Sequence, residues 1–298
     1  MCCWGGVCAH ARAHSCARFP MSRAFFLVDF QNDFCDPRGS LFVPGADQDC
    51  VRVAEFLRVH AAHVDALYVS CDRHPRMHVA HSCFWRSLTG DALGPFDTVS
   101  FERLRSGACV PVRVGYVQTV AGYLAFRAYT GKGPLYLWPE HCVRGSWGQG
   151  VHPLIVEAVR FWQRAHRTRR PQFFFKGENP CVEQFSVLSS EYPASQGTAD
   201  SLFVKRCQML RAHERIFVAG EALSHCVVCT LQDMQRAGVL SRVSLLKDGS
   251  SVVPGFEQKT AASVQTLCAQ GLTWLRMTEA AELLRTRFIF SGTEHQDS

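Results

Sequence analysis

A cysteine stands where a predicted strand gives way to a predicted helix. The segment "RIFVAG" (215–220) is an apolar run closed by a glycine, and "VVCTLQDMQRAG" (227–238) has the apolar spacing of a helix. Cys226 therefore lies near a helix N-terminus, where unpaired backbone amides lower the pKa of a thiol. Four roles fit it: a small core residue, half of a C-x-x-C redox pair with Cys229, a metal ligand, or a nucleophile.

Three charged residues also follow apolar runs: Asp29 follows "FFLV", Asp72 follows "YVSC" and Lys176 follows "FFF". In an open parallel sheet, ligands bind beyond the carboxyl ends of the strands, so we expect these groups to meet Cys226 at one edge. Lys176 would lower the pKa of the thiol further, and Asp29 would accept its proton and later return it. This grouping favours a nucleophile over a redox pair with Cys229.

A second group of residues offers imidazole and carboxylate ligands. The loop "CDRHPRMHVAH" (71–81) contains Asp72, His74 and His78 within seven residues, and "LWPEHCVRGSWG" (137–148) adds His141. Mixed nitrogen and oxygen ligands suit zinc, iron(II) or manganese, although histidines in loops are often merely solvated. We expect Asp72, His74 and one more histidine to bind a divalent metal.

The elements that position these residues alternate along the chain. Continuous apolar strands separated by helices predict an α/β fold, with a doubly wound parallel sheet flanked by helices. The predicted strands are 24–30, 66–71, 172–176, 215–220, 242–248 and 273–277. The predicted helices are 46–64, 153–166, 226–237, 257–270 and one from 278.

Two segments do not fit this alternation. Residues 82–136 have glycines, prolines and no clear period, and we expect an insertion or lid without a core of its own. Residues 1–20 carry four cysteines and no periodicity, and we interpret them as a disordered extension or a misassigned start. The predicted organisation is one domain over residues 21–290, with the insertion at 82–136.

Composition narrows the class of partner. The 298 residues carry a formal charge of +6 without a long block of one sign, and no apolar stretch is long enough to span a membrane. The basic run 160–170 is more typical of a solvated helix end than of a nucleic-acid site, so we expect neither a nucleic-acid nor a membrane partner. The cysteines indicate reduced thiols in a cytoplasmic protein. A homo-oligomer is left open.

Five segments together resemble the nicotinamidases of the isochorismatase-like cysteine hydrolase superfamily. The resemblance covers about residues 22–285, interrupted by 82–136, and implies a six-stranded parallel sheet with flanking helices. The segments, in the order found in that family, are "FFLVDFQNDFCDPRGSLFVPGAD" (25–47), "SCDRHPRMHV" (70–79), "LWPEHCVRGSWGQGVHP" (137–153), "FKGENP" (175–180) and "AGEALSHCVVCT" (219–230).

The resemblance implies a role for each matching residue. Asp29 matches the family's acid/base aspartate, Lys176 its lysine and Cys226 its nucleophile, which attacks nicotinamide to give nicotinate and ammonia through a thioester. The other matches are metal ligands at Asp72, His74 and His141, with His78 where some members supply a further ligand; pocket residues at Phe34 and Trp138; and an oxyanion hole from the amides of Ala222 and Cys226, in a turn that commonly contains a cis peptide. The implied cofactor is one zinc or iron(II) ion, which holds the pyridine nitrogen, and the implied role is NAD salvage.

Some positions depart from the family pattern. Ser224 replaces the usual aspartate two residues before the cysteine, and Phe185 replaces a tyrosine at the pocket edge. These changes, with the insertion, bear on substrate breadth more than on reaction type. Two alternatives stay open: a cysteine hydrolase of another small amide or carbamoyl substrate, and a non-hydrolytic metal- and thiol-rich redox or binding protein.

Overall fold

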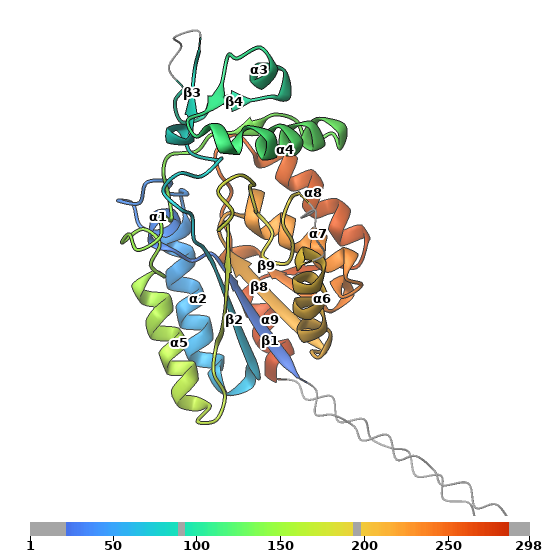
Figure 1. Cartoon of the computed structure of the whole chain (residues 1–298). Helices are drawn as coiled ribbons and strands as arrows, with labels where there is room; N and C mark the ends of the chain where they lie inside the picture. The colour runs from blue at the N-terminus through green and yellow to red at the C-terminus, as the bar shows by residue number, and fades with distance from the viewer. Residues whose placement is uncertain (1–21, 89–92, 193–197, 286–298) are drawn as a thin grey trace, which may run out of the picture.

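A computed structural model describes residues 22–88, 93–192 and 198–285 (Figure 1). The predicted extension at residues 1–20 and the last five residues of the predicted domain, 286–290, lie outside the described residues. In the described ranges, no helix combines the length and the apolar character needed to cross a membrane.

A six-stranded parallel sheet forms the centre of the fold, as predicted. Its strands lie in the order β10-β9-β8-β1-β2-β7. The order reverses between β1 and β8, so the chain winds outward in both directions from that pair and leaves a crevice at their carboxyl ends. The strands are β1 (Arg23–Val28), β2 (Ala66–Asp72), β7 (Gln172–Lys176), β8 (Arg215–Gly220), β9 (Val243–Leu246) and β10 (Thr273–Leu275).

Helices cover both faces of this sheet (Figure 1). One hydrophobic cluster joins the sheet to α2 (Ala46–His60), α5 (Pro153–Ala165) and α9 (Met277–Arg285). The other joins it to α6 (Thr198–Arg211), α7 (Val228–Arg236) and α8 (Glu257–Ala269). Because both faces are buried, alternate side chains of a strand all meet apolar partners, which explains the continuous apolar runs.

Two elements differ from the sequence expectation. The helix α6 was not predicted, because the exposed Leu202 and Val204 blur the apolar spacing that a helix normally shows. The predicted helix at 226–237 starts as a π-helical turn, Leu223–Val227, and only then continues as α7. Cys226 therefore lies inside an irregular first turn rather than at a regular helix start.

Residues 82–136 have a core of their own, so the expectation of a coreless insertion is wrong. They form two small antiparallel pairs and two helices, packed on a third cluster that includes Phe84, Tyr123 and Leu124. The cluster also takes in Cys181 and Val182, which follow β7. The elements are β3 (Trp85–Arg86), β4 (Thr98–Val99), α3 (Phe101–Arg105), β5 (Val110–Pro111), α4 (Val117–Tyr129) and β6 (Leu135–Tyr136).

Candidate active site

A buried lysine joins three of the residues predicted from the strand ends. Lys176 Nζ lies 2.9 Å from Asp29 Oδ2, 2.7 Å from Asp72 Oδ1 and 3.4 Å from Cys226 Sγ. None of the four side chains is exposed by more than a few per cent. Four segments that are distant in sequence thus bring a thiol, an ammonium group and two carboxylates to one point beyond the carboxyl ends of the strands.

The sheet itself sets these positions. Asp72 and Lys176 are lateral partners in the β2–β7 ladder, so the register of the two strands places their side chains together. Asp29 comes directly after β1 and has a left-handed backbone conformation, φ 50°. Ser70 holds it in place, because its hydroxyl donates to Asp29 Oδ1 at 2.7 Å. The geometry of this group is therefore set by strand ends rather than by long loops.

The electrostatics of the thiol differ from the sequence expectation. Burial raises the pKa of Cys226 well above its usual value, and the nearby Lys176 only partly opposes this. The expected lowering is wrong for the resting protein, because loss of hydration outweighs the helix terminus and the lysine. Burial also raises the pKa of Asp29. A neutral thiol thus lies beside a carboxylate of increased basicity, which is the arrangement that general base catalysis needs.

The ammonium group is charged throughout. Burial by itself would lower the pKa of Lys176, but Asp29 and Asp72 raise it well above its ordinary value. A lysine held cationic in a water-poor site stabilises negative charge on the neighbouring sulfur far more than a hydrated lysine would.

The predicted metal ligands also come together. Candidate ligand atoms of Asp72, His74 and His141 all lie within 4.8 Å of one another. The His74 Nδ1 bonds to the carbonyl oxygen of Gly177 at 2.9 Å and the His141 Nδ1 to that of Pro139 at 2.8 Å, which directs each Nε2 away from these carbonyls. The His74 Nε2 is buried without a hydrogen-bond partner. This donor set fits a divalent metal ion.

Burial affects the two imidazoles differently: at His74 it is outweighed by Asp72, which raises the pKa of that imidazole, whereas at His141 burial prevails. It lowers the pKa of His141 to about 3, helped by His74. A neutral imidazole offers the lone pair that a metal needs. Gly177 leaves room for these candidate ligands. A Cβ there would lie 2.4 Å from His74 Cε1 and 2.9 Å from Asp72 Oδ1, so a side chain would displace both residues.

His78 belongs to a neighbouring group rather than to the first. Its candidate ligand atom lies within 4.8 Å of those of His74 and His81, and its Nε2 is buried without a hydrogen-bond partner. His81 was not singled out from the sequence. Its Nε2 accepts a hydrogen bond from the His141 backbone N–H at 3.4 Å, which ties the two loops together.

A narrow cavity opens beside the thiol. Phe34, Trp138, Ala222 and Cys226, all predicted, line it, as do Asp72 and His141. The Glu221–Ala222 peptide is cis, and the Ala222 N–H has no hydrogen-bond acceptor among the described residues. That N–H is available to a ligand beside Cys226, as an oxyanion hole requires.

Three further residues of the site were missed as functional groups. Glu183 and His225 line the cavity, and Asp33 accepts hydrogen bonds from the backbone N–H groups of Cys142 and Ser40 at 2.7 Å and 3.0 Å. Asp33 thereby fixes the loop that carries His141. Its place inside the quoted "QNDF" motif was an available signal, whereas Glu183 and His225 carry no spacing that would distinguish them from ordinary polar residues.

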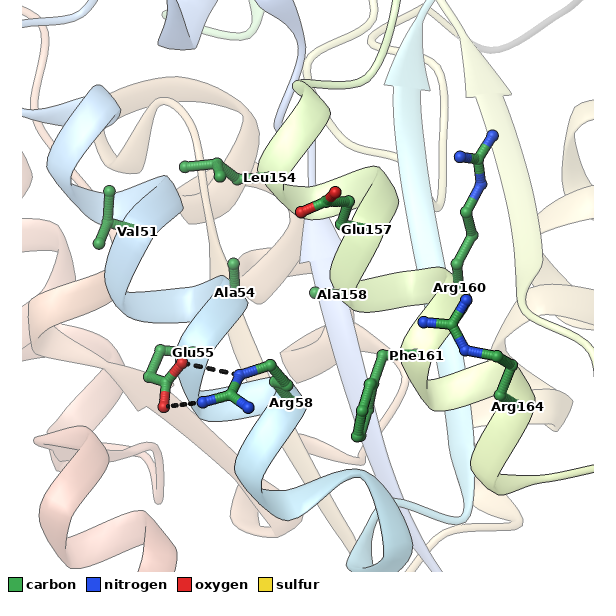
Figure 2. Close-up of a pocket in the computed structure, with 10 residues that line it drawn as sticks. All are labelled: Val51, Ala54, Glu55, Arg58, Leu154, Glu157, Ala158, Arg160, Phe161 and Arg164. Atoms are coloured by element: carbon green, nitrogen blue, oxygen red, sulfur yellow. Dashed lines mark hydrogen bonds and ion pairs between the residues drawn. The ribbon is translucent and has the colours of Figure 1, made fainter.

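A surface groove between α2 and α5 is chemically different (Figure 2). Its charged side chains, Glu55, Arg58, Glu157, Arg160 and Arg164, are all exposed. The Arg58 guanidinium donates to the Glu55 carboxylate at 2.7 Å and 2.9 Å, one helical turn apart. Water surrounds these charges and screens their mutual attraction, although the hydrogen bonds from Arg58 still lower the pKa of Glu55.

Comparison with known proteins gives consistent results. No protein-family model matches the chain. The nicotinamidase of Escherichia coli (strain K12) is 25% identical over 262 residues, which cover 87% of this chain and 97% of that protein. The solved yeast nicotinamidase superposes with a TM-score of 0.59 at 18% identity, covering 85% of this chain and 99% of that one.

A third relative was solved with a metal. The pyrazinamidase of Pyrococcus horikoshii in complex with zinc superposes with a TM-score of 0.52 at 20% identity, covering 86% of this chain and 99% of that one. In sequence and in fold, the chain thus resembles nicotinamidases over most of its length.

Proposed function

We propose that the protein is a metal-dependent cysteine amidohydrolase that converts nicotinamide to nicotinate and ammonia, in NAD salvage. One observation carries the proposal: Lys176 contacts both Asp29 and Cys226 beside a cavity whose wall includes two of the candidate metal ligands, Asp72 and His141. The curated and solved relatives named as nicotinamidases support the choice of substrate.

Acylation follows from these contacts. Asp29 takes the proton of the Cys226 thiol, and the sulfur attacks the carboxamide carbon to form the C–S bond. The amides of Ala222 and Cys226 hold the oxyanion, an interaction that typically contributes about 3–4 kcal/mol of barrier lowering. The C–N bond then breaks, and ammonia leaves with the proton that Asp29 returns.

Deacylation reuses the same carboxylate. Asp29 takes a proton from a water molecule, whose oxygen attacks the thioester carbon. The C–S bond breaks, nicotinate is released, and the sulfur regains its proton. Lys176 stays cationic through both halves and stabilises the sulfur whenever it carries negative charge.

A divalent metal, zinc or iron(II), would be held by Asp72, His74 and His141. When bound it supplies a Lewis acid that holds the pyridine nitrogen of the substrate. The chain's own contribution is orientation: Phe34 and Trp138 flank the ring, and the hydrogen bonds of His74 and His141 to backbone carbonyls fix the imidazoles. His78 would act as a further ligand only through the neighbouring histidine group.

The test is an ammonia-release assay on nicotinamide beside a panel of amides without a ring nitrogen, with metal analysis of the same sample. We expect release from nicotinamide and little from benzamide, because benzamide lacks the nitrogen that the metal would hold. Preference for a carbamoyl or aliphatic amide would favour the alternative hydrolase, and no release together with a Cys226–Cys229 disulfide would favour a redox protein.

Two sequence expectations stay predictions. The cytoplasmic location can be checked by cell fractionation, and a homo-oligomer by light scattering of the purified protein.

A further inference from the structure

A further buried carboxylate lines the cavity beside Asp72 and has no part in the steps above. Glu183 is 3% exposed and lines the same cavity as Asp72, His141 and Cys226. It follows Cys181 and Val182, which anchor this loop in the hydrophobic cluster of residues 82–136. A carboxylate almost never occupies such a place unless a partner compensates its charge.

The hydrogen bonds of Glu183 leave part of the carboxylate without a partner. Oε1 accepts the backbone N–H of Gln184 at 2.8 Å, and among the described residues no donor reaches Oε2. Gln184 is itself held, because its carbonyl oxygen accepts from Lys176 Nζ at 3.3 Å. Glu183 is thus positioned by the loop that also contacts the catalytic lysine, with one oxygen free for a ligand in the cavity.

The charge of the site points to a cation. Among the described residues, the carboxylates that contact Lys176 or line the cavity are Asp29, Asp72 and Glu183, so with the one ammonium group this set has a net charge of −2 when ionised. Burying uncompensated charge is strongly unfavourable. Burial raises the pKa of Glu183, and the His74 ring only partly opposes this; a divalent metal at Asp72, His74 and His141 would favour the ionised carboxylate and bring the set to neutrality.

The position of Glu183 relative to the clustered ligand atoms determines its role at the metal site. Candidate ligand atoms of Asp72, His74 and His141 lie within 4.8 Å of one another, and Glu183 belongs to none of the metal-holding groups found among the described residues. It lines the same cavity as Asp72 and His141, but its oxygens are not part of the group whose ligand atoms cluster within 4.8 Å. A water molecule bridges such a gap naturally.

We propose that Glu183 is a positioning residue of the metal site, which accepts a hydrogen bond from a water molecule on the divalent metal and completes the neutralisation of its charge. The inference rests on the metal-binding part of the proposed function, and not on which amide is hydrolysed. Carboxylates that hold metal-bound water raise metal affinity without being ligands.

The test measures metal affinity rather than activity. Zinc and cobalt(II) affinities of the full chain are determined by competition with a chromophoric chelator for the parent, Glu183→Gln and Glu178→Gln. Glu178 is an exposed carboxylate two residues after Lys176, so its variant removes the same charge outside the cavity. We expect Glu183→Gln to weaken both affinities about 10–100-fold and Glu178→Gln to leave them within about twofold.

The cobalt(II) absorption spectrum separates a water-mediated role from direct ligation. We expect the band positions and intensities of metal-saturated Glu183→Gln to match the parent, because the clustered ligands are unchanged. A changed spectrum would mean that Glu183 binds the metal directly, and this overturns the proposal. Equal affinities of Glu183→Gln and the parent, or an equal loss in Glu178→Gln, also overturn it.

A second variant covers a failure of Glu183→Gln to fold. Glu183→Asp keeps the charge but withdraws the oxygens by one methylene, so we expect metal affinity to fall at least about threefold. Parental affinity in Glu183→Asp would overturn the proposal. All of these measurements report metal binding. They can therefore contradict this inference without contradicting the proposed amidase activity, and an absence of amidase activity would not contradict this inference.

Discussion

Two ion pairs in this molecule join similar groups under opposite conditions. On α2, Arg58 and Glu55 lie 2.7 Å apart, and each side chain is 56% exposed (Figure 2). At the end of the sheet, Lys176 and Asp29 lie 2.9 Å apart with no exposed side-chain surface. The distances are similar, yet water screens the first pair and is excluded from the second.

The comparison shows that burial changes the chemistry of a charged group. An exposed ion pair contributes little to the free energy of folding, because water solvates each charge almost as well when the two are apart. In the buried set, water does not stabilise the charges, so each charge depends on its neighbours. Asp29 and Asp72 keep Lys176 cationic, whereas burial makes Asp29 more basic and keeps Cys226 a neutral thiol. The following substitutions test this contrast, from the largest expected effect to the smallest.

Cys226→Ala removes the reacting atom and should abolish ammonia release from nicotinamide, by on the order of 10⁴-fold or more in kcat. Metal content should stay at the parental level, because the sulfur is not among the predicted ligands. The control is Cys229→Ala, one helical turn away, which should keep most activity. Retained activity in Cys226→Ala would remove the nucleophile assignment, and equal losses in both variants would support the C-x-x-C reading.

His74→Ala removes a candidate ligand whose Nε2 has no hydrogen-bond partner among the described residues and lies 3.7 Å from Asp72 Oδ2. We expect metal content after dialysis to fall about 10–100-fold or more, together with weaker substrate binding. His63→Ala, an exposed histidine on the surface, serves as the control in the same metal analysis. Unchanged metal content in His74→Ala would take this residue out of the ligand set.

Lys176→Met leaves Asp29 and Asp72 without their buried counter-charge. Breaking such a set by removing one partner costs about 3–5 kcal/mol, so the free energy of unfolding should fall by about that amount. Urea unfolding at matched metal content measures it. A loss no larger than that of a surface substitution would show that water or the metal compensates these carboxylates, and the contrast between the two regions would fail.

His225 provides a pH test that does not involve the predicted ligands. Burial lowers its pKa from about 6.5 to about 4, with a smaller contribution from Lys259. Because the folded-state pKa is the lower one, the neutral imidazole contributes stability that is fully present above pH 6.5 and is lost as pH falls towards 4. In His225→Asn, the decrease in unfolding free energy over this range should shrink by on the order of 2 kcal/mol.

The control for that measurement is His63→Ala, which should follow the parental curve because His63 is exposed. If the pH curves of His225→Asn and the parent were parallel from pH 6.5 to 4, His225 would be hydrated in the folded protein. The cavity wall would then be more open than its lining residues indicate.

Arg58→Met is the smallest change. The variant loses an exposed pair and keeps much of the apolar stem, so we expect no measurable change in melting temperature or in ammonia release. A clear loss of either would show that the α2–α5 groove contributes to stability or catalysis, and the two regions would be less different than their burial indicates.

The sheet and its charged edge could be predicted because both depend on local sequence. Six apolar runs indicate the six strands, although Phe173 and Phe175 of the edge strand β7 are exposed, and a polar residue directly after such a run lies at the carboxyl edge of the sheet. The ladder that joins Asp72 to Lys176 then follows from parallel pairing. These predictions needed no knowledge of which side chains are remote from water.

Properties that depend on tertiary burial could not be predicted in this way. The pKa of Cys226 was expected to fall and instead rises, because desolvation is decided by residues that are far away in sequence. The separate core of residues 82–136 was missed because most of its elements are very short, and because the helical spacing of Val120, Tyr123 and Leu124 in α4 was not recognised. Glu183 was missed because only the folded cavity shows that its carboxylate is buried.

The pairing of Asp72 with Lys176 across neighbouring strands has an evolutionary consequence. Loops drift, lengthen and exchange readily, whereas a step of one residue between adjoining strands would turn one of these side chains to the opposite side of the sheet. Asp72 and Lys176 therefore stay together as long as the pairing of β2 with β7 is kept. The lining at Phe185 and Val253 lies outside this ladder and is free to diversify, so descendants of this scaffold could acquire new substrates while their chemistry stays the same.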